Sequence, residues 1–134
     1  MAQIPLPRPY QDTAEYWQAA KAHRFVVQKC RSCGEHQFYP RGVCSHCLSS
    51  DLEWSEASGK ATVYSYSVNY RAGHPGFQDK TPFVLAIVEL AEGPRMMTNI
   101  VGCDPESVSI GMAVEVCFED VTEEVTLPMF RPAG

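Results

Sequence analysis

The chain of 134 residues lacks long hydrophobic runs, since its longest uninterrupted apolar stretch extends only from Phe83 to Val88. A membrane-spanning helix needs about 20 such residues, so no membrane anchor is expected. The N-terminus has neither a basic start nor an apolar core, so no secretory signal is expected either. Without an export signal we expect a cytoplasmic protein, and because the cytoplasm is reducing, we do not expect the 6 cysteines to form a disulfide framework.

The motifs of familiar catalytic sites are also missing. The sequence contains no G-x-S-x-G, Walker, H-E-x-x-H or G-x-G-x-x-G element. Its 4 histidines are scattered, and none lies at helical spacing from a carboxylate that could form an acid–base pair with it. These absences disfavour a stand-alone enzyme.

Positive charge is scarce in the C-terminal part of the chain. Residues 1–50 carry six lysines and arginines against three acidic residues, a net charge of +3. Residues 51–134 carry five against thirteen, a net charge of −8. A phosphate-bearing ligand would be attracted to the first part, whereas the second would repel a long polyanion. The distribution therefore disfavours general nucleic-acid binding.

The strongest motif is a pair of C-x2-C elements with ten residues between them. Two such turns aim four sulfurs at one point and complete a tetrahedron around Zn²⁺. Four protein ligands leave no position for water, so we predict a structural zinc site rather than a catalytic one or a thioredoxin-type redox pair. We interpret His36 and His46 as bystanders. The predicted ligands are Cys30, Cys33, Cys44 and Cys47.

The regular structure falls into three parts, which we predict at residues 1–29, 30–50 and 51–134. The first combines a proline-rich arm with a helix from Thr13 to about Arg24, begun by a capping box at Asp12 and Glu15. Such a short helix is marginal alone, so it must dock on its own domain or on another chain. Tyr16 and Trp17 are the candidate contacts.

The third part predicts five β-strands. Residues 62–70, 114–119 and 125–129 alternate between apolar and polar side chains, and residues 95–101 follow a turn as a further strand. Residues 82–90 are nearly continuously apolar, as expected of a strand covered on both faces. Five antiparallel strands most economically close into an OB-fold barrel, with an open sandwich as the alternative. The connection at residues 71–81 is long and glycine-rich. In it, His74 and Phe77 are candidates for contact with a ligand or partner, although the loop could equally be without function.

With these parts in view, the chain resembles the acyl-CoA-associated OB-fold proteins of the "domain of unknown function thirty-five" family. One departure is Leu48, where the family commonly has a glycine after the second cysteine pair. The likeness is carried by the stretches Phe25–Gly34, Phe38–Cys44, Ser58–Tyr66, Pro82–Leu90 and Ile110–Val116.

This resemblance implies a mainly β fold, with an N-terminal helical arm and a rubredoxin-like zinc ribbon before a five-stranded OB-fold barrel. It further implies a non-catalytic accessory subunit of a thiolase-like enzyme or of a lipid-transfer-type aldolase that cuts steroid side chains. The expected assembly is a hetero-oligomer of two plus two subunits that braces an acyl-CoA site. The candidates for the CoA phosphates are the basic residues near the metal, Arg24, Lys29, Arg31 and Arg41.

A nucleic-acid-binding module is the alternative function, because zinc ribbons and OB-folds recur in proteins that bind single strands. Such proteins need a basic groove interleaved with aromatic residues. The net charge of −8 on residues 51–134 disfavours this alternative.

Overall fold

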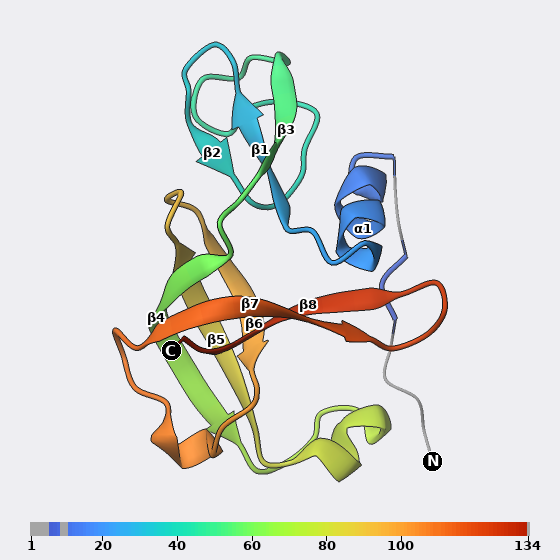
Figure 1. Cartoon of the computed structure of the whole chain (residues 1–134), viewed down its shortest axis with the longest axis vertical. Coiled ribbons are helices and arrows are strands. Elements are labelled where there is room, and N and C mark those ends of the chain that lie inside the picture. The colour runs from blue at the N-terminus through green and yellow to red at the C-terminus, as the bar shows by residue number, and fades with distance from the viewer. Residues whose placement is uncertain (1–5, 9–10, 134) are drawn as a thin grey trace.

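The computed structural model describes residues 6–8 and 11–133. Residues 1–5, 9–10 and 134 lie outside the described residues, and they include much of the predicted proline-rich arm. A three-stranded sheet lies above a closed barrel, with one helix beside both (Figure 1). Within the described residues, no helix has the length and apolar character needed to cross a membrane.

The upper sheet belongs to the cysteine-rich segment and has the strand order β2-β1-β3. Its strands are β1 (Val26–Cys30), β2 (His36–Gln37) and β3 (Leu52–Glu56), and both pairings are antiparallel. β3 pairs with β1 over five residue pairs although it lies inside the range that we expected to form the barrel. The boundaries of the three predicted parts stay a prediction.

The barrel closes in the order β4-β5-β6-β8-β7 and confirms the expected OB-fold over an open sandwich. Alternation along its strands buries one face, as on β5, where Val84, Ala86, Val88 and Leu90 are buried. Short 3-10 helices at Pro75–Lys80 (η1) and Pro105–Ser107 (η2) lie between strands. The strands are β4 (Lys60–Asn69), β5 (Phe83–Leu90), β6 (Arg95–Ile100), β7 (Ala113–Asp120) and β8 (Thr126–Pro132).

The helix α1 (Ala14–Lys21) is shorter than predicted at both ends. Thr13 rather than Asp12 occupies the N-cap position. At the other end His23 has a φ of 58°, a left-handed conformation that stops a helix. The N–H groups of His23 and Arg24 donate to the carbonyls of Ala20 and Ala19 at 2.9 and 2.8 Å. These two bonds form a Schellman motif, which usually carries glycine at the left-handed position.

The side chain of His23 explains why a histidine holds that position. Its Nε2 lies 2.9 Å from Oδ1 of Asp120 at the end of β7, and its ring stacks on Phe118 at a centroid distance of 5.1 Å. Asp120 also accepts a hydrogen bond from the hydroxyl of Thr126 at 2.5 Å. The bonds from Thr126 and then His23 hold the pKa of Asp120 below its usual range. The end of α1 is therefore fastened to the barrel.

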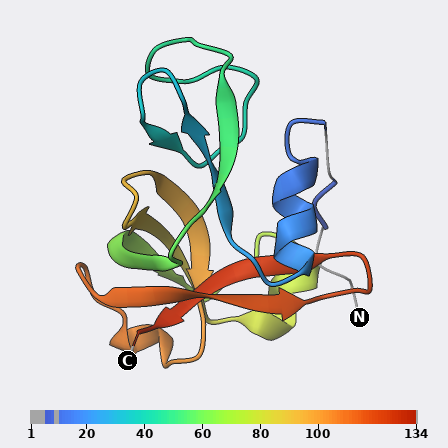
Figure 2. The ribbon, with the colours of Figure 1, turned by 45° about the horizontal axis from the view of Figure 1, so that its top comes forward.

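One hydrophobic core runs through helix, upper sheet and barrel. Phe25, just before β1, packs edge-on against Phe130 of β8 at 6.0 Å and against Tyr16 of α1 at 6.3 Å. Phe38 packs against Tyr16 at 5.5 Å. The turned view shows α1 beside the sheet and above the barrel (Figure 2). Because the core is continuous, the upper sheet is fixed in orientation on the barrel.

Candidate metal centre

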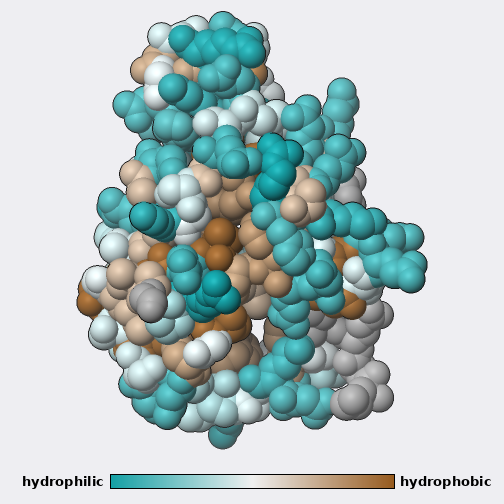
Figure 3. All heavy atoms as spheres, viewed as in Figure 1, coloured by the Kyte–Doolittle hydropathy of each residue, from teal (hydrophilic) through white to brown (hydrophobic). Residues whose placement is uncertain are grey.

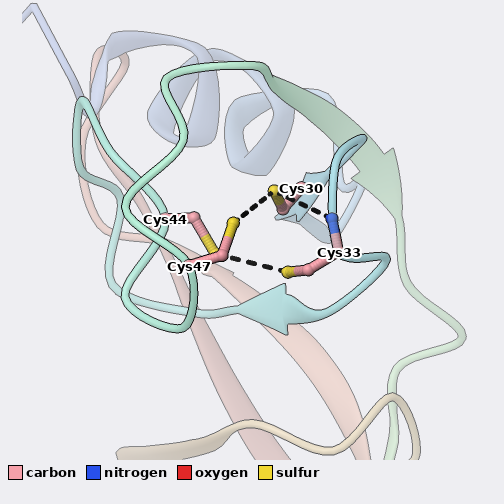
Figure 4. A group of neighbouring side chains, drawn as sticks. All are labelled: Cys30, Cys33, Cys44 and Cys47. Atoms are coloured by element: carbon pink, nitrogen blue, oxygen red, sulfur yellow. Dashed lines mark hydrogen bonds between the residues drawn. The ribbon is translucent and has the colours of Figure 1, made fainter.

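The four predicted cysteine ligands converge on one point. Their sulfurs all lie within 4.8 Å of one another and face a common centre (Figure 4). The Sγ atoms of Cys30 and Cys47, and those of Cys33 and Cys44, are 3.6 Å apart. Zinc–sulfur bonds of about 2.3 Å require sulfur separations of about 3.8 Å in a tetrahedron. The arrangement therefore fits a four-coordinate zinc ion, and neither His36 nor His46 belongs to the group.

The two turns that carry the sulfurs have the same backbone form. In the first, the N–H of Gly34 donates to the carbonyl of Cys30 at 2.9 Å, and Gly34 has a φ of 79°. In the second, the N–H of Leu48 donates to the carbonyl of Cys44 at 3.0 Å, and Leu48 has a φ of 65°. The leucine that departs from the family pattern thus keeps the turn by adopting a conformation that favours glycine.

Replacing Leu48 with glycine should therefore raise the stability of the zinc-loaded chain by about 0.5–1 kcal/mol. Leu48 is 77% exposed, so the change removes little packing while it relieves backbone strain. Urea unfolding in excess zinc measures the effect. Ser50→Gly is the matched control, because Ser50 is exposed and has no positive φ, and it should lower stability. Destabilisation by Leu48→Gly would contradict the strain argument.

Two buried glutamines hold the loop that leads into the second turn, and neither was predicted from the sequence. Gln37 donates from Nε2 to Oε1 of Gln28 at 2.6 Å, and Gln28 in turn bonds both backbone groups of Arg41. The Oε1 of Gln37 accepts from the N–H of Ser45 at 2.8 Å. Buried amides need such partners, and here they fix the loop that positions Cys44. Gln28 interrupts the apolar run at residues 25–27, which was the one available signal.

The metal-binding thiols differ in acidity. The pKa of Cys30 falls to about 6, mainly because the Cys33 N–H donates to its sulfur. The backbone bond from Glu35 lowers the pKa of Cys33, but burial and the bonds with the other three sulfurs together outweigh it and raise this pKa to about 12. A metal ion must displace the protons that such a group retains, so metal binding weakens as the pH falls.

Of the four candidate contacts for the CoA phosphates, two form ion pairs with carboxylates and two do not. Nε of Arg24 lies 2.9 Å from Oε1 of Glu56, and Arg31 pairs with both Asp51 and Glu53 at 3.1 and 3.0 Å. Among residues 11–133, Lys29 and Arg41 have no carboxylate partner within 4.0 Å. Their charges are therefore the ones that remain uncompensated by an ion pair.

The four candidates for partner or loop contact also differ in position. Tyr16 is buried in the shared core, where burial raises the pKa of its hydroxyl, whereas Trp17 is half-buried and packs against that core. His74 caps η1, because its Nδ1 accepts from the N–H of Gly76 at 2.9 Å. Phe77 packs on Phe83 at 5.6 Å. Of these, Trp17, His74 and Phe77 keep surface that a partner could contact, whereas Tyr16 is buried.

Comparison with known protein families identifies both parts of the chain. Residues 17–53 match the rubredoxin-like zinc ribbon domain of ChsH2, and residues 54–119 match its C-terminal OB-fold domain. A solved structure described as the Ltp2-ChsH2(DUF35) aldolase is 42% identical, with a TM-score of 0.85 over 96% of this chain and 99% of that chain. The cysteine quartet is therefore the metal centre of a zinc ribbon.

Curated relatives agree with this assignment. A probable enoyl-CoA hydratase alpha subunit of Thermomonospora curvata is 43% identical over 96% of this chain, which spans only 40% of that protein. A benzoylsuccinyl-CoA thiolase subunit of Thauera aromatica is 29% identical over 58% of this chain and 56% of its own length. A DUF35 domain-containing scaffold protein of Methanothermobacter thermautotrophicus is 39% identical, covering 84% of this chain and 86% of its own. On these matches and on its ribbon and barrel, the chain belongs to the DUF35 family.

Proposed function

We propose that the chain is a non-catalytic zinc-binding subunit that binds a thiolase-like enzyme or lipid-transfer-type aldolase and braces its acyl-CoA site. The observation that carries the proposal is the closed four-sulfur centre on a ribbon that shares its core with the barrel. Relatives named as a scaffold protein, a thiolase subunit and an aldolase component support it.

The donor set fits zinc, because four thiolates are soft ligands and fill every coordination position of the ion. Bound zinc would supply structural support, with no open position at which a substrate could be activated. The ribbon's own residues then orient its loops. The glutamine bonds set the loop before Cys44, and the ring contacts of Phe25 and Phe38 hold the ribbon on the barrel.

The surface suits a protein that works in an assembly. Large apolar side chains that are at least a third exposed occur on both ribbon and barrel, and the space-filling view shows apolar surface over the barrel (Figure 3). Apolar surface that one chain leaves exposed is often buried in an interface with another protein. These exposed residues are Tyr39, Val43, Leu48, Tyr64, Tyr66, Tyr70, Leu85, Met97 and Ile110.

Within this role, Lys29 and Arg41 are the proposed contacts for the CoA phosphates, since Arg24 and Arg31 already pair with carboxylates. Arg41 lines a surface hollow with His36 and His46, so three basic side chains lie around one space. Arginine binds phosphate through two parallel hydrogen bonds, which makes it the stronger candidate of the two.

Replacing Arg41 with alanine should weaken CoA binding by the assembled complex about tenfold and leave the fold unchanged. Its side chain is exposed, and only its backbone groups bond Gln28. Isothermal titration of the complex with CoA and with dephospho-CoA measures the loss. Arg71→Ala, an exposed arginine on the barrel side, is the matched control and should bind CoA normally. Equal CoA affinity of Arg41→Ala and the parent would remove Arg41 from the site.

Co-purification tests the subunit role. The tagged chain, co-expressed with a thiolase-like or lipid-transfer-type aldolase candidate, should elute with it as one species. Light scattering should then give the mass of two plus two subunits. A chain that stays monomeric beside every such candidate would contradict the proposal.

A further inference from the structure

The two cysteines of each metal-binding turn differ in exposure. Cys30 and Cys44, the first of each C-x2-C turn, are buried, with exposed fractions of 0% and 1%. Cys33 and Cys47, the second of each turn, are exposed. The metal centre therefore has one side toward the protein and one side toward solvent.

The local fold produces this difference. Cys30 is the last residue of β1, the middle strand of its sheet. The N–H of Cys44 donates to the carbonyl of Ser49 at 2.7 Å, which holds Cys44 inside the second turn. On the other side, Ser32 and Leu48, the chain neighbours of the two exposed cysteines, are exposed as well. A small neutral molecule can therefore reach the outer cysteines.

The sulfurs lie in two close pairs, each with one exposed and one buried member (Figure 4). The Sγ atoms of Cys33 and Cys44 are 3.6 Å apart. Those of Cys47 and Cys30 are also 3.6 Å apart. A disulfide has a sulfur–sulfur distance of about 2.05 Å, so each pair needs only a small further approach. Both pairs join the two turns, whereas a thioredoxin-type pair lies within one turn.

This combination is the one that oxidants select. Cysteines that respond to oxidants are accessible thiolates with a second cysteine beside them that resolves the first product to a disulfide. Sulfurs that serve as metal ligands are deprotonated, and the thiolate is the nucleophilic form. In this ribbon the exposed cysteine of each pair has the access, and the buried one has the position of the resolving thiol.

We propose that Cys33 and Cys47 are oxidation sites, through which a hydroperoxide reversibly switches the ribbon off. The exposed sulfur attacks a peroxide oxygen, the O–O bond breaks, and hydroxide leaves as the sulfur becomes a sulfenic acid. The buried sulfur of the pair then attacks the sulfenic sulfur, the S–O bond breaks, and a second hydroxide leaves as the disulfide forms. The two sulfurs give up one electron each, the peroxide gains two, and both hydroxides take protons from solvent.

Each disulfide removes two thiolates from the metal site, so the affinity for zinc is lost and the ribbon loses the ion on which its fold depends. A reducing thiol restores all four ligands. The inference goes beyond the proposed scaffold function, because the chemistry belongs to this chain and needs no partner.

The first test treats the full zinc-loaded chain with hydrogen peroxide in the presence of dimedone, which traps sulfenic acids, and locates the label by peptide mass. At early times the two exposed cysteines of the ribbon should carry about fivefold more label than the two buried ones. Equal labelling of all four, or earlier labelling of the buried pair, would overturn the proposal.

The later products test the pairing. Without dimedone, peptide mapping should find the disulfides Cys33–Cys44 and Cys30–Cys47. Release of one zinc per chain, followed by colour with pyridylazoresorcinol, should accompany them. Dithiothreitol with added zinc should then restore hydrogen-exchange protection in β1–β3. Disulfides within one turn, or zinc that stays bound after oxidation, would contradict the mechanism.

The double variant Cys33→His with Cys47→His tests where oxidation begins. Two cysteines and two histidines also form a zinc site, and imidazole cannot become a sulfenic acid, so peroxide should release zinc about tenfold more slowly. Cys103→Ser is the matched control, because Cys103 lies outside the metal group, and it should release zinc as the parent does. Release at the parent's rate from the double variant would refute the assigned sites. If the double variant binds no zinc, the dimedone labelling of the parent decides the same question.

Discussion

Replacing Cys33 with serine is expected to lower the zinc content of the purified chain from about one ion to less than about 0.2 and to unfold the ribbon. A hydroxyl is a much poorer zinc ligand than a thiolate, so only three strong ligands remain. Structural zinc contributes about 10–16 kcal/mol to domains of this kind. Elemental analysis measures the metal, and hydrogen exchange measures the protection of β1 and β3.

The loss should also abolish assembly with the proposed partner enzyme, because Phe25 and Phe38 connect the ribbon to the barrel through Phe130. Cys103→Ser is the matched control, since Cys103 lies outside the metal group, and it should keep normal zinc content. Normal zinc content and normal assembly in Cys33→Ser would contradict a structural role for the metal.

Replacing Phe130 with alanine is expected to cost about 3–5 kcal/mol of unfolding free energy. Phe130 is fully buried, and its ring packs against Phe25 at 6.0 Å, so the change leaves a cavity where ribbon and barrel meet. Domains of this size are stable by only about 5–15 kcal/mol, so the loss is a large fraction of the total. Urea unfolding of the zinc-loaded chain measures it.

Two further variants test whether position rather than aromatic character explains the effect. Phe130→Leu keeps most of the volume and should cost less than about 1.5 kcal/mol. Tyr70→Ala removes an aromatic ring that is 62% exposed and should change stability by less than about 0.5 kcal/mol. A cost below about 1 kcal/mol for Phe130→Ala would show that ribbon and barrel do not depend on a common core.

Alternation made three of the five barrel strands predictable, at residues 62–70, 114–119 and 125–129, and an apolar run made the strand at residues 82–90 predictable. The apolar run at residues 82–90 predicted a strand covered on both faces, but only one face is fully covered, since Val84, Ala86 and Val88 are buried while Leu85 is 37% exposed. The sequence did not show directly that the barrel closes. Closure depends on the pairing of β6 with β8, which joins residues 30 positions apart through the single pair Ile100 and Phe130.

Local pattern failed where tertiary contacts decide the structure. The segment at Leu52–Glu56 shows no clear alternation, and it becomes β3 because the second cysteine turn returns the chain beside β1. The helix was expected to reach Arg24, yet it ends at Lys21 because Asp120 and Phe118 hold His23 in a left-handed conformation. No glycine marks that stop.

The metal centre also has parts that the local sequence predicts and parts that depend on tertiary contacts. Its four ligands were readable from spacing alone, since C-x2-C turns carry their geometry within five residues. The buried pair of Gln28 and Gln37, which supports the second turn, depends on strand pairing between β1 and β2. The phosphate candidates also needed the structure, because the ion pairs of Arg24 and Arg31 join residues more than 19 positions apart.

Elemental analysis of the purified full chain, with its folding followed while a chelator removes the metal, tests the central claim most directly. We predict one zinc per chain and loss of hydrogen-exchange protection in β1–β3 as the zinc leaves. A chain that contains no metal and yet keeps the ribbon folded would contradict it.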